Sequence, residues 1–195
     1  MYIISGQTYY SESEPILSAG IISGSYVKGN GSLLTNLPGR LSTEDVTLTE
    51  NTGIVYNPSL SADGKYMGLV ISGVAGDVLA FGDIIHLSAI DSRWELADAN
   101  SASGAVGDCR GIIGICVLAA AGNGSATKIL LNGIVRADAK FPALVLNGPV
   151  FISETAGVVT NTAPSTTDAI IRVLGFGLTA DEMYFNPSSD WLTSV

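Results

Sequence analysis

The residues GDVLAFGDIIHLS at 76–88 and RGIIG at 110–114 form a pattern that returns as PALVLNGPVFIS at 142–153 and RVLG at 172–175. Each copy contains an apolar run, a Gly followed by Asp or Pro, a second apolar run that ends in Ser, a polar loop, and a returning run that begins with Arg and ends with Gly. Short β-branched runs separated by turn residues are typical of a strand meander. The sequence therefore predicts that one β meander is present twice.

The two copies lie roughly 60 to 65 residues apart, which predicts related units at about residues 76–135 and 142–191. A single hairpin is marginally stable, so we expect the two units to bury their faces against each other. The predicted fold class is all-β, with a duplicated hairpin or meander module forming a barrel- or sandwich-like domain. This domain spans residues 41–195, and an extended N-terminal arm of residues 1–40 precedes it.

The composition is that of a weakly charged, β-rich structural protein. Of the 195 residues, 47% are hydrophobic and only 14% are charged, well below the usual quarter. The formal net charge is -9 with only nine Lys and Arg residues, which argues against a nucleic-acid partner because phosphate binding needs clustered basic residues. We expect no nucleic acid among its partners.

No secretory or membrane segment is predicted. The start of the chain lacks a basic region followed by a sustained apolar core, and the longest apolar run, residues 111–122, is far shorter than a membrane span. We therefore expect a protein that is made in a cytoplasm and contacts no membrane.

The two cysteines, Cys109 and Cys116, are predicted to be buried and reduced. On one continuous strand they would face opposite sides at a separation that excludes a disulfide, unless the chain folds back between them. With a single His, the chain has too few ligands for a zinc site, and we expect no cofactor.

The arm is expected to be ordered by other chains. Its apolar residues stand as small islands among Ser and Gly, with neither a helical nor a strand period, so no core can be built from them. We predict that these islands anchor the protein to a larger assembly, and they comprise Tyr9, Tyr10, Ile16, Leu17, Ile21 and Ile22.

Three strand segments are predicted outside the repeated motifs. Residues 41–56 alternate as a half-buried hairpin, and residues 65–72 form a strand whose core face holds Lys65, Met67, Leu69 and Ile71. Residues 128–135 are apolar on both faces, so this strand belongs in the middle of the domain or between subunits. We place Ile129, Leu131 and Val135 at a subunit seam.

Within the arm, the run GNGSLLTNLP at residues 29–38 resembles a Gly-x-Gly-x-x-Leu-Thr-x-Leu stretch of tailed-bacteriophage fibre proteins. In those shafts and linkers three chains wind round one axis with the Leu residues inward. The resemblance implies that Leu33, Leu34 and Leu37 lie at a trimer seam. An ordinary Gly turn followed by a short apolar strand is the alternative.

Residues 62–191 resemble a β-rich module of tailed-bacteriophage virion proteins, found at the ends of tail and head fibres and in small capsid-decorating proteins. The resemblance rests on spaced Gly, Pro and aromatic positions, among them Gly64-Lys65-Tyr66, Phe81-Gly82-Asp83, Trp94, Gly114-Ile115, Gly148-Pro149-Val150, Thr155-Ala156-Gly157, Pro164-Ser165, Arg172-Val173-Leu174-Gly175 and Phe185-Asn186-Pro187. It implies a structural, usually trimeric, virion component and brings no catalytic residue to transfer. A long shaft is not expected, because only about 40 residues precede the hairpins.

The residues that could carry chemistry have simpler interpretations. His86, the single His, lacks a nucleophile motif and is expected to be an ordinary strand residue, with a subunit contact as an alternative position. The acidic pairs at 12/14, 44/45 and 181/182 are better explained as solvated turns than as a glycosidase pair. Asp83, Asp91 and Asp98 lack the spacing of a calcium loop and suit turns.

We expect a non-enzymatic, homotrimeric decoration or head-fibre protein on the outer capsid surface of a tailed-phage virion. Its partners would be its own copies and the major capsid protein or another virion structural protein, bound through the arm. The alternative is a short tail fibre or fibre tip that binds a host-surface receptor, such as a glycan, through the loops at 97–107 and 119–125. An enzyme, the third possibility, would need a cleft with clustered carboxylates.

Overall fold

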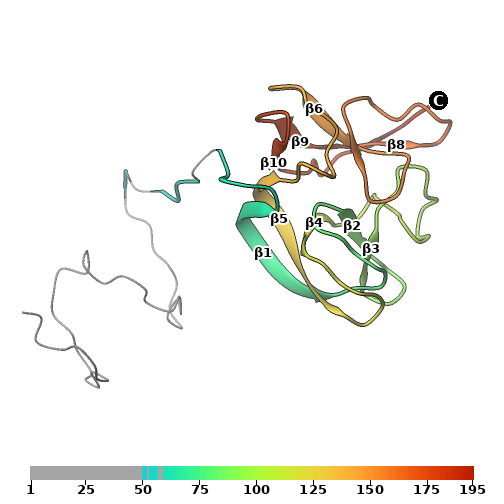
Figure 1. Ribbon diagram of the computed structural model, residues 1–195. Coiled ribbons are helices and arrows are strands. Elements are labelled where there is room, and N and C mark those ends of the chain that lie inside the picture. The colour runs from blue at the N-terminus through green and yellow to red at the C-terminus, as the bar shows by residue number, and fades with distance from the viewer. Residues whose placement is uncertain (1–49, 52, 57–58) are drawn as a thin grey trace, which may run out of the picture. The chain divides into compact units, whose positions relative to one another are not determined.

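The structure is a computed structural model that describes residues 50–51, 53–56 and 59–195 (Figure 1). The chain divides into two compact units, Met1–Thr52 and Gly53–Val195, and every described strand belongs to the second unit. The predicted arm and most of the predicted 41–56 hairpin lie outside the described residues. Residues 53–56, which are described, form no strand and expose Ile54 and Val55, so this part of the hairpin prediction is wrong.

The described residues form strands and loops, without a helix of the length and apolarity that crossing a membrane requires. The strands are β1 (Lys65–Val74), β2 (Ile84–Leu87), β3 (Trp94–Leu96), β4 (Ile113–Leu118), β5 (Ala126–Arg136), β6 (Pro149–Ile152), β7 (Val159–Thr160), β8 (Ile170–Ile171), β9 (Val173–Gly177), β10 (Glu182–Phe185) and β11 (Leu192–Thr193). The predicted all-β fold is confirmed.

The sheet has the same strand order in its two halves. Nine strands form one antiparallel sheet in the order β3-β2-β4-β5-β10-β9-β6-β7, with β1 also paired to β5. Strands β2 to β5 make up the first half and β6, β7, β9 and β10 the second, and the halves join where β5 pairs with β10. A separate two-stranded sheet joins β8 to β11.

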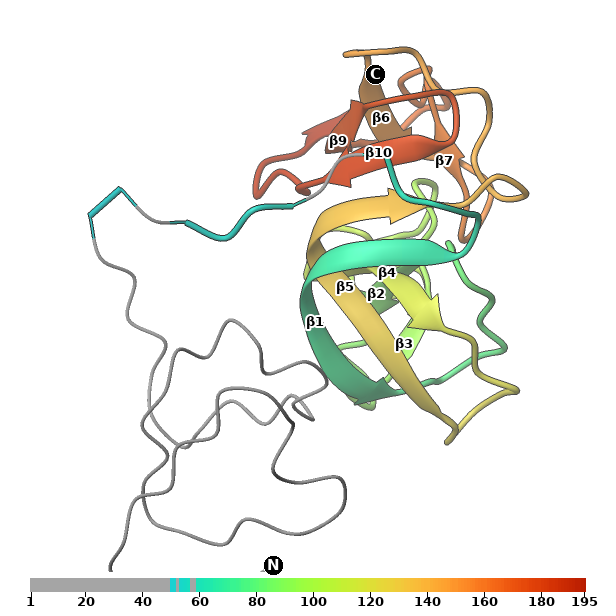
Figure 2. The ribbon, with the colours of Figure 1, turned by 60° about the vertical axis from the view of Figure 1, so that its left-hand side comes forward.

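Strand β5 is the centre of this arrangement. It pairs with β1 along its whole length, while its other edge pairs with β4 through residues 128–130 and with β10 through residues 133–136. The sheet curls strongly at this strand (Figure 2). Gly68 and Gly133 face each other there with φ of 148° and 147°, and a Cβ on either would meet backbone atoms of the other strand at 2.7 Å or less. Only glycine allows this approach.

The main core lies on the inner face of the curled sheet and draws side chains from both halves. Ile84, Ile115 and Leu130 of the first half share it with Val150 and Leu174 of the second, and all five are fully buried. Each belongs to a strand whose next residue points to the opposite face.

A second, smaller core covers the outer face of the first half. Ile85, Trp94, Cys116 and Ile129 point outward from the sheet, and the segments around Leu79 and Ala120 lie over them. Leu79 and Ala120 form a β-bridge with backbone hydrogen bonds in both directions. The chain itself therefore buries both faces of β5 here.

This second core corrects the predicted subunit seam. Ile129 and Val135 have no exposed surface in the single chain, because Ile129 lies in the second core and Val135 in the main core. Neither side chain can contact a neighbouring subunit in this conformation. Of the three seam residues on β5, Leu131 alone is partly exposed.

The predicted core face of β1 is also wrong. Tyr66 and Val70 pack against the main core, whereas Leu69 and Ile71 are 59% and 38% exposed. A bulge between Leu69 and Val70, next to Gly68, shifts the pairing with β5 by one residue. The extra residue of this bulge is Leu131 on β5, so the alternation of β1 continues unbroken from Tyr66 to Ile71, and the prediction exchanged its two faces.

Candidate interaction surface

The outer face of the second half carries a row of apolar side chains that is partly exposed. Pro149 pairs with Phe176, Phe176 with Tyr184, Tyr184 with Ile134, and Ile134 with Met67. Residues directly opposite each other on neighbouring strands share a face, so this row crosses five strands. Phe176 is 46% exposed whereas Ile134 is 6% exposed, so the row is open around Phe176 and covered where it reaches β5.

An apolar hollow continues this surface towards the C-terminus. Phe151 and Val173, which are paired across β6 and β9, line it together with Trp191 and Leu192. Its volume is about 310 Å³. Trp191 is 39% exposed and Leu192 is 70% exposed, so two large apolar side chains stand at its rim. We call the row and this hollow together the outer apolar face.

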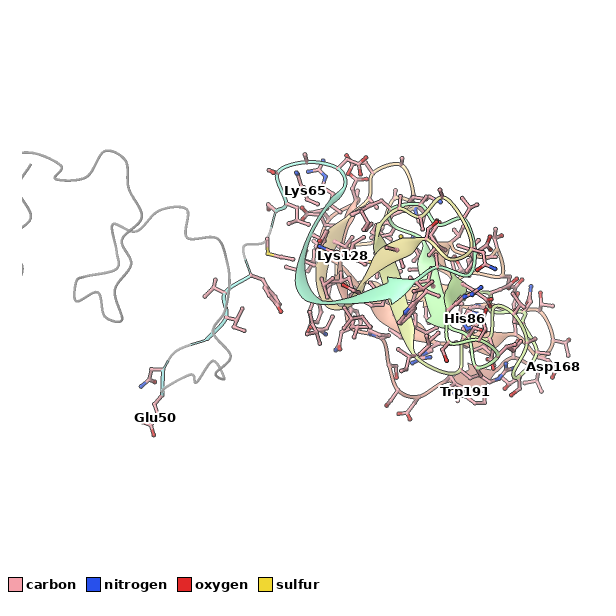
Figure 3. All side chains as sticks on the ribbon, turned by 90° about the horizontal axis from the view of Figure 1, so that it is seen from below. Glu50, Lys65, His86, Lys128, Asp168 and Trp191 are labelled. Atoms are coloured by element: carbon pink, nitrogen blue, oxygen red, sulfur yellow. The ribbon has the colours of Figure 1, made fainter. Side chains whose placement is uncertain are left out.

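The C-terminal segment places Trp191 at this position. The backbone N–H of Ser188 donates to Val173, and β11 pairs with β8 so that Leu192 lies opposite Ile171. Trp191 lies at the periphery of the body, whereas His86 lies within it (Figure 3). The guanidinium carbon of Arg110 lies 5.4 Å from the centre of the Trp191 ring, a cation–π distance.

A second hollow, of about 470 Å³, lies beside Arg110. Its lining includes the exposed Ile112, the partly exposed Leu131 and Pro187. Of the three predicted seam residues on β5, Leu131 therefore lines this hollow, whereas Ile129 and Val135 are buried in the two cores. Sequence reasoning gave no role to Phe176 or Trp191.

The Arg of each repeat has a different function in the fold. Arg172 is 6% exposed and donates to the carbonyl oxygens of Cys109 and Gly111, both at 2.6 Å, and of Ser188 at 2.8 Å. Burial lowers the pKa of Arg172. This side chain connects the two halves and fixes the C-terminal segment, while Arg110 pairs with a carboxylate.

His86 is buried in β2, as expected for a strand residue, and is therefore not at a subunit surface. Its Nε2 accepts a hydrogen bond from the N–H of Gly107 at 2.9 Å and lies 3.6 Å from Oε2 of Glu95. Burial lowers the pKa of His86, against the opposing charge of Asp108. Burial raises the pKa of Glu95, and the neighbouring Asp91 adds to this effect.

The three aspartates considered for calcium occupy turns. Asp83, Asp91 and Asp98 each accept a hydrogen bond from a backbone N–H two or three residues away, and Asp83 forms an ion pair with Lys140. Among the described residues, no group of three or more His, Cys, Asp or Glu side chains is arranged to hold a metal ion.

One acidic residue and both cysteines have defined positions in the core. Glu182 is 2% exposed and accepts a hydrogen bond from the N–H of Leu60, so the prediction that it belongs to a solvated turn is wrong. Cys109 and Cys116 are free and buried, as predicted. Burial raises the pKa of Cys109 to about 11 and also raises that of Cys116.

The six anchoring residues of the predicted arm and the three Leu residues at 33, 34 and 37 lie outside the described residues. So do the acidic pairs at 12/14 and 44/45. Comparisons of the chain with protein-family models, with curated proteins and with solved structures found no match.

Proposed function

We propose that this chain is a non-enzymatic structural protein of a tailed-phage virion, a trimeric decoration or head-fibre protein bound to the outer capsid surface. The observation that carries the proposal is the outer apolar face, which the described residues leave open around Phe176, Trp191 and Leu192. The assignment of the assembly to a phage virion rests on the sequence resemblance.

The outer apolar face supports association between copies. Full burial of a Phe or Leu side chain contributes about 1.5–3 kcal/mol. Phe176, Trp191 and Leu192 together could therefore contribute several kcal/mol once a neighbour covers them. Contiguous apolar surface of this kind marks an interaction site on a soluble protein.

The arm supplies the contact with the capsid. A small body with few charges has little surface with which to hold a curved shell, whereas an extended segment can add strands to exposed sheet edges along its path. Three arms in one trimer would raise the overall affinity through their effective concentration.

A tail fibre that binds a host glycan is the second candidate, and Trp191 favours it. The exposed Trp191 ring stands beside a hollow that Ser188 and Asp190 also line. An aromatic face with nearby polar groups is a suitable platform for a sugar ring.

Binding to phage heads tests the leading proposal. A full-length variant with Ser at Tyr9, Tyr10, Ile16, Leu17, Ile21 and Ile22 should remain a trimer but lose binding to heads that lack the native protein. A control variant with Ala at Ser11, Ser13 and Ser18 should bind as the native chain does. Persistent binding of the six-residue variant would exclude the arm as the anchor, and labelled protein at the tail would favour the fibre.

A further inference from the structure

The geometry points to the free edge of β1 as the acceptor of an added strand, and we infer that residues 44–49 of a second copy supply it. This inference rests on the proposed homo-oligomer and names one contact between its subunits. The donor segment, Glu44-Asp45-Val46-Thr47-Leu48-Thr49, lies outside the described residues.

Strand β1 is the long unprotected edge of this sheet. It has ten residues and pairs only with β5, so its other edge is open among the described strands. The strands at the two ends of the sheet path, β3 and β7, have only three and two residues. Folded proteins shorten or charge such edges, because unpaired N–H and C=O groups recruit other chains.

The open edge is apolar and almost uncharged. Leu69, Ile71 and Val74 are 59%, 38% and 44% exposed, and Lys65 is the one charged residue of β1. Met67 on the same strand also begins the apolar row of the outer apolar face. An additional strand here would extend that row and cover the edge in one step.

The path of the chain into β1 favours a donor from another copy. Leu60 donates its N–H to Glu182 of β10, and its carbonyl oxygen accepts from Arg136 at 3.0 Å. Strand β10 pairs with the edge of β5 opposite to β1. The chain is therefore fastened on the side of the sheet that faces away from the open edge, as its route over β10 and then into β1 shows (Figure 2).

The donor segment matches the edge in pattern and in charge. Val46 and Leu48 alternate with Thr47 and Thr49, the pattern of a strand with one apolar face. Acidic residues lie at both ends of the segment, with Glu44 and Asp45 as its first two residues and Glu50 directly after it.

Basic residues lie near both ends of β1, one on β1 itself and one on the paired strand β5. Lys65 begins β1, and Lys128 lies opposite Ser72 near its other end. Neither lysine forms an ion pair within the described residues. Lys65 and Ser72 are about 23 Å apart along an extended strand, and Glu44 and Glu50 would be about 20 Å apart in the same conformation. The charges of donor and acceptor are therefore complementary at both ends.

Cysteine cross-linking between two differently tagged full-length chains tests this contact. One chain carries Leu69→Cys on β1 and the other carries Leu48→Cys, and the mixed protein is treated with a short bismaleimide. The native Cys109 and Cys116 are buried with raised thiol pKa values and stay unreactive. Val78→Cys replaces Leu69→Cys in the control, because Val78 is 63% exposed and lies outside the strands.

We expect a product that carries both tags for Leu69→Cys with Leu48→Cys, in several-fold excess over the Val78→Cys control. A yield equal to that of the control would overturn the inference. So would linkage found only inside single chains that carry both cysteines, because the donor would then be the chain's own segment. Repeating the experiment with Ile71→Cys guards against an effect of one substitution. Head binding without this cross-link would contradict the strand contact and leave the proposed function standing.

Discussion

The two halves of the sheet have the same strand order, but their outer faces are covered to different extents. In the first half, the segments around Leu79 and Ala120 cover the outward side chains of Trp94 and Ile129. In the second half, the corresponding side of the sheet exposes Phe176. The outer face of the first half is covered within the single chain, whereas that of the second half is open around Phe176. The difference shows that two sheet halves with one strand order need not share the same cover.

The largest expected effect is on the covered face. Trp94→Ala should lower the free energy of unfolding by about 3–5 kcal/mol, because it removes a large side chain that is 3% exposed in the second core. Denaturant unfolding of the monomeric species measures this. A loss below about 1 kcal/mol would mean that this core contributes little and that the two outer faces are alike.

The next effect concerns the join between the halves. Arg172→Met should cost about 3 kcal/mol, since it leaves the carbonyl oxygens of Cys109, Gly111 and Ser188 without their donor. Arg110→Met is the matched control, with an expected cost of about 1 kcal/mol or less because its ion pair with Asp108 is partly exposed. Equal costs for the two variants would show that the repeated Arg residues are equivalent.

A pH dependence just below the ordinary pKa of His should come from His86 in the first half. Burial lowers the pKa of His86 in the folded chain below its ordinary value of 6.5. Just below pH 6.5 the unfolded chain therefore binds a proton at His86 and the folded chain does not. Stability should therefore fall as the pH drops from 6.5 through the folded value, and His86→Gln should flatten this part of the profile. Unfolding measured across that range provides the test, and an unchanged profile in the variant would contradict it.

Glu95 should act in the opposite direction. Its folded pKa is raised above 4.5, so the folded chain binds the extra proton and stability falls as the pH rises through the raised value. Glu95→Gln should remove this loss. A steeper loss of stability with rising pH in that variant would count against a buried, destabilised carboxylate.

The smallest effect on stability is expected at the open face. Phe176→Ser should change the unfolding free energy of the monomer by about 1 kcal/mol or less, because the side chain is already 46% exposed. The same variant should dissociate at higher protein concentration than the native chain. Loss of monomer stability comparable to that of Trp94→Ala would mean that the chain itself covers Phe176.

The sequence predicted the fold class and the central strands but not the faces. Alternation located Trp94–Leu96, and the two-faced apolar run located β5. The face of β1 was missed because Met67, Leu69 and Ile71 make its outer face look the more apolar, whereas Gly68 and Ser72 interrupt the inner face of Tyr66 and Val70. The cover over Ile129 was missed because it comes from loop-like segments that are distant in sequence.

The outer apolar face could not be predicted for a different reason. A strand such as β9 has the same alternation whether its outer side meets solvent, another segment or another chain. Phe176 looks like a core residue in sequence, and only the structure shows that nothing among the described residues buries it. The register shift between Val150 and Phe151 leaves Leu174 of β9 unpaired, so Leu174 is buried and Phe176 exposed although alternation places them on one face.

The oligomeric state of the full-length chain tests the central claim most directly. Sedimentation equilibrium at micromolar concentration should give a species of three times 20.1 kDa, because the open half needs neighbours to cover it. A single species of 20.1 kDa throughout this range would contradict the claim that this chain is a building unit of a larger assembly.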